Sequence, residues 1–332
     1  MNTMTQLEPF LGSLDTLIST AQGSKKEYVM PVLKNLGSVT IPLIREIIAP
    51  AAFRNEQQDI TDIDDASGIR RVRAVANKFK YGERQRGLQI LRYFGAGGSC
   101  PQNRTELPKG QTAGSVFDLN TIVFGDSTDV SNKVLPVKAS ALYTDAVSLL
   151  PYADCVGKTF HNRAAEDGTL FDAETKKNSS NLFERYFLKP GTLLVQTVTF
   201  NGRTAPVEAV KHFLLCVGLA GAYGGQTSIY GINVRNHIAG IYGAPLERDI
   251  TSPYVLVDTL GERDNSNIAT EKLANIFYER FPISVEPSET SGIVKSMMNK
   301  LENNDTDMRK QYVEGSKKIS SYFDAWFEGI VG

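Results

Sequence analysis

Three patterns in the 332-residue sequence predict an α+β fold. Residues 38–48 are rich in Val, Ile and Leu, which is typical of a buried strand. Residues 189–244 give a strand, a helix, a glycine-rich turn and a second strand in succession, and two helices are expected near the C-terminus. With 41% hydrophobic and 22% charged residues, the chain can bury a sizeable core. This composition excludes disordered, collagen-like and disulfide-scaffold classes.

The first quarter of the chain is expected to contain two helices and three strands. Leucines at helical spacing predict an amphipathic helix over residues 1–22, and strands follow at 27–33 and 38–48. Alternating residues over 70–80 predict a third strand, and the spacing over 83–94 predicts a helix. The loop between the second and third strands is acidic and holds Glu56, Asp59, Asp62, Asp64 and Asp65.

Two polar segments interrupt the middle of the chain. Residues 95–114 are rich in Gly, Pro, Gln and Thr, which predicts a loop or a small insertion. Strand structure is expected to resume over 133–148, and the turn-rich residues 151–180 form a second insertion.

The most regular pattern lies between residues 189 and 244. A strand is expected at 192–200, and Pro206 then stands at the start of a helix over 207–219, where its missing N–H costs little. Glycines 218, 221, 224 and 225 form a turn before a strand at 227–241. Two terminal helices are expected at 271–281 and 308–327, joined by a polar linker over 286–306. These patterns divide the chain into residues 1–94, insertions at 95–188, the regular unit at 189–250 and a helical region at 251–332.

Cysteine usage and hydropathy predict a cytoplasmic protein. The cysteines Cys100, Cys155 and Cys216 are few, odd in number and far apart, so a disulfide framework is not expected. The chain shows no basic-then-apolar leader, and its longest apolar stretch, residues 213–222, is too short to span a bilayer. No contact with a membrane is expected.

Charge is segregated along the chain although the net charge is only −1. Residues 70–92 hold eight cationic side chains and one acid, Glu83, so this segment carries +7 and the remainder −8. Such a run can neutralise phosphates, and aromatic rings beside it can stack on bases. The alternative is a solvated charged face, which nearby acids normally balance. The aromatic residues in question are Phe79, Tyr81, Tyr93 and Phe94.

The glycine-rich turn is a second candidate for anion binding, because glycines let backbone N–H groups approach phosphates. It does not match G-x-G-x-x-G, and it follows a helix, so dinucleotide binding is not predicted. A tight turn that needs glycine only for backbone geometry is the alternative.

Two catalytic alternatives were weighed against binding. Residues 125–127, Gly-Asp-Ser, resemble the nucleophile motif of GDS-type esterases, which needs a histidine base with an aspartate three residues earlier. None of the three histidines, His161, His212 and His237, has that aspartate. Cysteines and histidines also lack the spacing of a zinc site, so no metal and no cofactor is expected. His212 and Cys216 could face one metal from a helix, but core packing is the commoner explanation for such a pair.

Several segments together resemble the backbone subunit of type I-D CRISPR effector complexes, a family of repeat-associated RNA-binding proteins. The resemblance covers residues 27–248 and is most specific over 223–247. The matching residues are Phe124-Gly125-Asp126-Ser127 with Ser131 and Lys133, Lys189-Pro190-Gly191-Thr192, Tyr223 to Ser228, then Gly231, Val234, Arg235, Asn236, His237, Gly240, Tyr242 and Glu247. The sequence departs from the family's pattern at two places. It lacks the cysteine-rich zinc knuckle, and Ile229 stands where a basic residue is usual.

The resemblance implies a modified RRM-like, ferredoxin-like palm with finger- and thumb-type insertions and a C-terminal helical part. Copies of the chain would assemble along a CRISPR (guide) RNA, and a protruding hairpin would interrupt pairing with target DNA or RNA at regular intervals. Other partners would be the large, cap and guide-processing subunits. The chain would be a non-catalytic scaffold. A target-RNA-cleaving version, using Asp59, Asp62, Asp64 or Asp65 with a divalent metal, is the first alternative.

The expected RNA-binding residues fall in three groups. The first supplies cations for phosphates, the second donates from hydroxyls, amides and the backbone, and the third makes polar contacts from a loop. They are Arg70, Arg71, Arg73, Lys78 and Lys80; Gly225, Gln226, Thr227, Ser228, Arg235, Asn236 and His237; and Ser131, Asn132 and Lys133.

Overall fold

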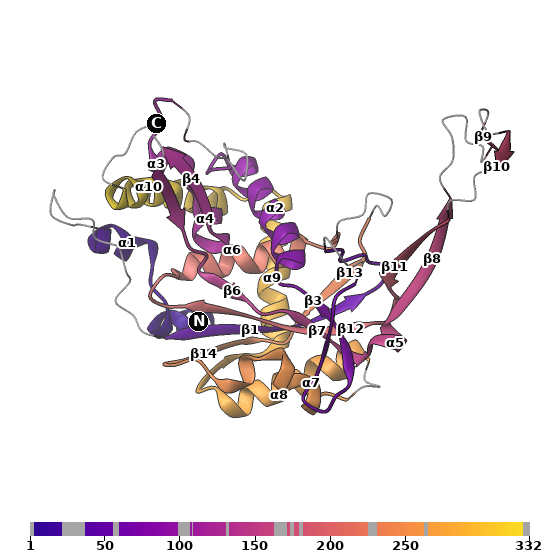
Figure 1. The fold of residues 1–332 in the computed structure, drawn as a ribbon. Helices are drawn as coiled ribbons and strands as arrows, with labels where there is room; N and C mark the ends of the chain where they lie inside the picture. Colours follow the sequence, from indigo (N-terminus) through magenta and orange to yellow (C-terminus); the bar gives the residue numbers. More distant parts are fainter. Residues whose placement is uncertain are drawn as a thin grey trace.

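The computed structural model is organised around one antiparallel sheet with helices on both faces (Figure 1). No helix in the described part of the chain is long and apolar enough to cross a membrane. The described residues are 3–21, 37–55, 60–98, 107, 109–130, 133–162, 171–172, 176–178, 182–224, 231–261 and 265–327.

Two long apolar strands form the centre of the sheet. β1 (Ser38–Ile47) pairs with β12 (Leu193–Asn201) over nine residues, with Ser38 opposite Asn201. Both strands are buried almost throughout, because helices cover both faces, and this explains their near-continuous apolar sequences. β12 also pairs with β6 (Ala141–Tyr143) and β7 (Ala146–Pro151), and β7 continues to β3 (Arg70–Ala74) and β2 (Asp62–Asp64). On the other side β1 pairs with β13 (Val234–Ile238) and β14 (Ile241–Ala244), and β14 pairs with β15 (Ile283–Val285).

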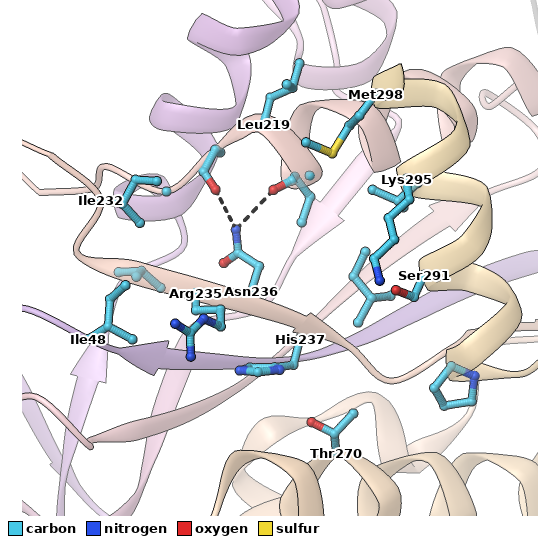
Figure 2. Close-up of a pocket in the computed structure, with 18 of the residues that line it drawn as sticks. Ile48, Leu219, Ile232, Arg235, Asn236, His237, Thr270, Ser291, Lys295 and Met298 are labelled. Atoms are coloured by element: carbon cyan, nitrogen blue, oxygen red, sulfur yellow. Dashed lines mark hydrogen bonds between the residues drawn. The ribbon is translucent and has the colours of Figure 1, made fainter. Parts of the chain in front are cut away.

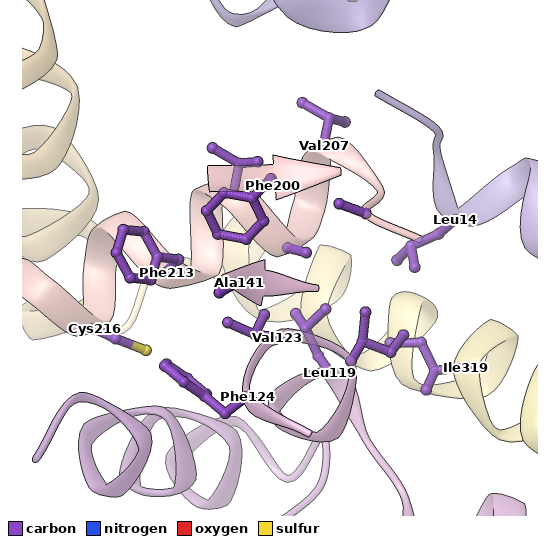
Figure 3. Packing of buried hydrophobic residues seen from close by; sticks show 14 of the residues in the cluster. Leu14, Leu119, Val123, Phe124, Ala141, Phe200, Val207, Phe213, Cys216 and Ile319 are labelled. Carbon is purple, nitrogen blue, oxygen red and sulfur yellow. The ribbon is translucent and has the colours of Figure 1, made fainter. Parts of the chain in front are cut away.

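The two faces of the sheet carry separate hydrophobic cores. The larger core joins the sheet to α2 (Asn77–Phe94), α4 (Leu119–Phe124), α6 (Val207–Leu219) and α10 (Thr306–Trp326). In it Phe200 of β12 packs edge-on against Phe213 of α6, with ring centroids 5.3 Å apart (Figure 3). The other face is covered by α7 (Pro253–Thr259) and α8 (Ser266–Arg280). Each fully buried Phe or Leu contributes roughly 1.5–3 kcal/mol to this packing.

The predicted N-terminal helix is divided into two pieces. A 3₁₀ helix, η1 (Thr3–Phe10), and α1 (Leu14–Ala21) are separated at Gly12, whose N–H donates to the carbonyl of Ala205 at 3.0 Å. The Gly12 carbonyl accepts from Val207 at 2.9 Å, so tertiary hydrogen bonds replace helical ones at this point. Leu7, Leu11, Leu14 and Leu17 are nevertheless buried, as the spacing predicts.

Three other expectations about secondary structure need correction. The strand expected over 70–80 ends at Ala74, and α2 begins at Asn77. The strand expected over 227–241 is two strands, β13 and β14, separated by a bend at Gly240 with φ 109°. The expected linker at 286–306 is mostly a helix, α9 (Pro287–Glu302), with Pro287 in its first turn. The strand expected at 27–33 lies outside the described residues.

A hairpin follows the first predicted insertion, residues 95–114, and a second hairpin overlaps the other insertion, residues 151–180. Beside the short helix α3 (Ala113–Val116), β4 (Asp126–Val130) pairs with β5 (Lys133–Val137). After the single turn α5 (Tyr152–Cys155), β8 (Val156–Asn162) pairs with β11 (Leu182–Leu188) to form a long hairpin that projects from the body (Figure 1). Near its tip lie β9 (Phe171–Asp172) and β10 (Lys177–Asn178). The second insertion is therefore an extended arm.

Candidate nucleic-acid interface

A buried polar cluster lies between the sheet and α2, and it consists of Arg45, Glu83, Tyr143, Tyr223 and Asn236. The Arg45 guanidinium donates to Glu83 Oε1 at 2.6 Å and to Asn236 Oδ1 at 2.8 Å. The Tyr223 hydroxyl donates to Glu83 Oε1 at 3.0 Å, and the Tyr143 hydroxyl donates to Glu83 Oε2. Both charged side chains are fully buried, so this Arg45 cluster joins β1, β6, β13 and α2 through one ion pair.

Burial and the carboxylate of Glu83 decide the protonation states in the Arg45 cluster. Burial disfavours the charged form of Arg45, but Glu83 more than offsets this, and the pKa of the guanidinium is raised. Burial and the negative charge of Glu83 both raise the pKa of Tyr143 and of Tyr223 well above the ordinary value. The two hydroxyls therefore stay protonated and act as donors to the carboxylate.

Hydrogen bonds between Asn233 and Tyr223, a member of the Arg45 cluster, tie together the described residues on either side of 225–230, the predicted glycine-rich loop. Tyr223 N–H donates to Asn233 Oδ1 at 2.9 Å, and the Asn233 amide donates to the Tyr223 carbonyl at 2.8 Å. Gly224 has φ 104°, and a Cβ there would lie 2.5 Å from the carbonyl oxygen of Ala52. A larger residue would not fit, so this glycine is required for backbone geometry. The predicted Gly225, Gln226, Thr227 and Ser228 lie outside the described residues, next to this anchor.

Cations and an exposed ring on the first turns of α2 lie close to the same anchor. Gly82 of α2 approaches the Tyr223 ring, to which a Cβ would lie 3.1 Å away. The flanking Tyr81 side chain is 62% exposed. Burial lowers the pKa of Lys78, and burial together with the positive charge of Arg84 lowers the pKa of Lys80. A lowered pKa means that no nearby negative charge offsets the burial of these two ammonium groups. A phosphate bound beside them would therefore stabilise their charged form.

We call Lys78, Lys80, Tyr81 and Arg84 the α2 surface. Lys78 donates to the carbonyl of Arg54, and Arg84 forms an ion pair with Asp126 at 2.8 Å. Lys80 has no ion pair with any residue in the part of the chain that the structure describes. A helix, and not the expected strand, presents Lys78 and Lys80.

The three arginines of β3 do not form one phosphate-binding row. Arg71 is buried, forms an ion pair with Asp65 at 2.5 Å and donates to the Leu149 carbonyl at 2.5 Å. This side chain is therefore engaged inside the protein, and its contact with phosphate stays a prediction. Arg73 is partly exposed and bonds Asp145 at 2.6 Å. Arg70 is 59% exposed in its side chain and lies over the ring of Tyr152. Because successive strand residues point to opposite faces, Arg70 and Arg71 have different surroundings.

The polar residues expected on β13 also separate by strand face. Asn236 belongs to the Arg45 cluster, and its amide donates to the carbonyls of Val217 and Ala220 at 3.1 Å. Its side chain is therefore engaged within the protein, and its contact with RNA stays a prediction. Arg235 is exposed, and His237 bonds Glu46 at 2.7 Å. The third expected group is Ser131, Asn132 and Lys133, which follow β4 in the sequence. Ser131 and Asn132 are outside the described residues, and Lys133 is the first residue of β5.

Two residues of the catalytic alternatives, Asp62 and Asp65, have structural partners. Asp62 pairs with Arg70, and Asp65 accepts from Ser67 and Arg71. Ser127 is exposed at the start of β4. Among the residues that the structure describes, no group of three His, Cys, Asp or Glu could hold a metal ion. Asp59 and the side chain of His161 are outside that part.

Comparison with known proteins identifies the family. The family model described as Csc2 Crispr matches residues 60–321, which include most of the sheet, both insertions and the C-terminal helices. The chain belongs to the Csc2 family. A crystal structure of Thermofilum pendens Csc2 is similar with a TM-score of 0.62, at 12% identity and over 99% of each chain. A chain of a CRISPR RNA-guided surveillance complex in a pre-nicking state is similar with a TM-score of 0.50, at 13% identity, over 78% of this chain and 99% of that one. No curated protein sequence matches.

The Csc2 match confirms the predicted α+β architecture with a C-terminal helical region. The Arg45 cluster is the feature that sequence reasoning missed. Its signal is Arg45 itself, a lone basic side chain within the apolar run of β1. A charge placed there must be paired with a buried acid, which Glu83 of α2 provides.

Proposed function

We propose that this Csc2-family protein is the RNA-binding backbone subunit of a type I-D CRISPR effector complex. The observation that carries the proposal is the family match over residues 60–321. In this role several copies bind along one guide RNA and hold it for pairing with target nucleic acid. Base pairing reads the sequence, while the protein contacts phosphates and backbone shape. Other partners are the large, cap and guide-processing subunits.

The RNA path that fits the geometry passes over the α2 surface and the glycine-rich loop. Lys78 and Lys80 are the cations there that no nearby negative charge offsets, and Tyr81 offers an exposed ring for a base. Arg70 and Arg73 are further accessible cations from the expected set. Beneath this surface the Arg45 cluster positions Tyr223, which in turn bonds Asn233 on the far side of the loop residues.

The β8–β11 arm is the protruding hairpin of the proposal. It extends from the body with exposed aromatic side chains, Phe160 at 52% and Phe171 at 49%. Lys158 lies over the Phe160 ring at 5.2 Å. A hairpin with rings and cations can insert between bases and contact phosphates on either strand. In the proposal, each copy uses this arm to interrupt guide–target pairing.

The proposed role is non-catalytic. Asp62 and Asp65 are engaged with arginines of β3, which supports a structural role for the acidic loop before β3 and not the target-RNA-cleaving alternative. Incubation of the assembled complex with target RNA and Mg²⁺ tests this. If target RNA is cut into regularly spaced fragments, and the Asp62→Ala variant gives none, the protein is a nuclease and the non-catalytic role is wrong.

RNA binding by the purified full-length protein tests the proposal. We expect fluorescence anisotropy to give equal affinities for two single-stranded RNAs of unrelated sequence. The double variant Lys78→Ala/Lys80→Ala weakens binding of both. Lys310→Ala, which removes an exposed cation of α10 paired with Glu314, is the matched control and leaves the affinity unchanged. Wild-type protein that binds neither RNA overturns the proposed function.

A further inference from the structure

A groove with a volume of about 840 Å³ follows the open edge of β13 (Figure 2). Within the described residues β13 pairs with β1 alone, because β15 pairs with β14 and stops short of it. The opposite wall is α9, whose Val294 and Met298 pack toward Gly218 of α6. The groove therefore combines a strand edge with a helical wall.

The chemistry of the groove favours a protein segment over nucleic acid. Much of its lining is aliphatic, and none of the described residues that line it is Phe, Tyr or Trp, so it offers no ring for a base except the imidazole of His237. Ile232 at the groove is 67% exposed. Such an exposed aliphatic side chain beside an apolar groove marks a contact surface.

Three charged side chains give the groove a polarity. Arg235 extends from β13 and is 60% exposed, with Glu46 at 3.4 Å as its partner. Lys295 reaches from α9 toward β13, as Figure 2 shows. Lys295 and Glu271 form no ion pair with any residue that the structure describes. A complementary segment would carry two acids, one cation and an exposed aliphatic residue.

The chain itself contains such a segment at residues 245–249, directly after β14. All five residues are exposed, and Leu246 is 73% exposed. Glu247, Arg248 and Asp249 follow it, so two acids and one cation match the two cations and one acid of the groove with opposite signs. We call residues 245–249 the acidic segment.

The groove and the acidic segment lie at opposite ends of β1. Val234 of β13 is opposite Ile47, and Ala244 of β14 is opposite Ser38. Nine residues of strand separate Ser38 from Ile47, or roughly 30 Å at about 3.3 Å each. The segment cannot fold back into the groove of its own chain over that distance. Two different surfaces at opposite ends generate a heterologous, head-to-tail contact, which forms an open filament unless the rotation closes a ring.

We propose that the groove between β13 and α9 binds the acidic segment of a second copy of this chain. Leu246 of one copy packs beside Ile232 of the next, while Glu247 and Asp249 face Arg235 and Lys295. The inference rests on the proposed function, because a head-to-tail contact is what repeated binding along one RNA requires. Its test separates the two claims, since the contact is measured with and without RNA.

Complementation of two one-sided variants tests the head-to-tail contact. Ile232→Asp disables the groove and Leu246→Asp disables the segment, and each is expected to weaken self-association about ten- to a hundredfold. Each variant keeps one intact surface, so an equimolar mixture forms pairs but no assembly larger than a pair. Sedimentation velocity of the RNA-free protein, and of the protein on a long single-stranded RNA, measures the assembly size. Val134→Asp changes an exposed valine of the β4–β5 hairpin and is the matched control that assembles normally.

Three results overturn the docking proposal. The first is wild-type protein that stays monomeric without RNA and binds long RNA without cooperativity. The second is a variant that assembles like wild type, and the third is a mixture that gives no pairs. Binding to an RNA too short for two copies is unchanged in both variants if the proposed function holds. Wild-type protein that does not bind this short RNA contradicts the proposed function and not the docking proposal.

Discussion

Replacement of Glu83 by leucine is expected to lower the free energy of unfolding by about 3–5 kcal/mol, the cost of leaving one buried charge without its partner. Glu83 and Arg45 are both 0% exposed, and their atoms approach to 2.6 Å. Glu83 also accepts from the hydroxyls of Tyr143 and Tyr223. Glu83→Leu therefore leaves a guanidinium and two hydroxyl groups without their acceptor.

The double variant Arg45→Met/Glu83→Leu removes both charges and is expected to cost less than Glu83→Leu alone, because no unpaired charge remains. Urea titration at neutral pH, followed by circular dichroism, measures both variants. Lys158→Ala, which removes the exposed pair with Glu184 at 3.5 Å, is the control and should change stability by less than about 1 kcal/mol. If Glu83→Leu costs less than about 1 kcal/mol, or if the double variant costs as much as Glu83→Leu or more, the central role of the ion pair is refuted.

Two further predictions concern stability: one tests the buried imidazole of His212, and the other compares the buried Arg71 with the exposed Arg70. Burial lowers the pKa of His212 to about 3, against 6.5 for the free side chain. The unfolded chain therefore takes up this proton first, and stability falls below pH 6.5 by up to about 1.4 kcal/mol per pH unit. His212→Gln, which can still accept a hydrogen bond from Tyr312, should make the urea midpoint depend less on pH between pH 6 and pH 4. The same dependence on pH as in wild type would contradict the claim that buried His212 stays neutral. Arg71→Met should lower the urea midpoint clearly and Arg70→Met only slightly, since Arg71 is buried against Asp65 and Arg70 is exposed; equal shifts would contradict this distinction.

Local sequence signals predicted the regular unit of the fold well. The helix expected at 207–219 is α6, because Pro206 stands immediately before it and apolar residues fill it on several sides. The helix α9 was missed because only a narrow stripe, including Thr290 and Val294, is buried and the rest is polar. Its available signal was Pro287 in the first turn.

The candidate interface was harder to predict, because burial depends on partners distant in sequence. Arg70 and Arg71 are adjacent and identical in type, yet only Arg71 finds the carboxylate of Asp65 and the carbonyl of Leu149. Charge counting located the cationic segment correctly but could not separate structural arginines from accessible ones. Asn236 shows the same limit, since its amide is used by the carbonyls at the end of α6.

The salt dependence of RNA binding tests the central claim, that the α2 surface neutralises phosphates, most directly. For single strands, each neutralised phosphate contributes about −0.7 to the slope of log K against log salt concentration. Lys78→Ala/Lys80→Ala should therefore make the slope about 1.4 less steep than in wild type, while Lys310→Ala should leave it unchanged. A double variant with the wild-type slope and affinity would contradict the claim that RNA passes over α2.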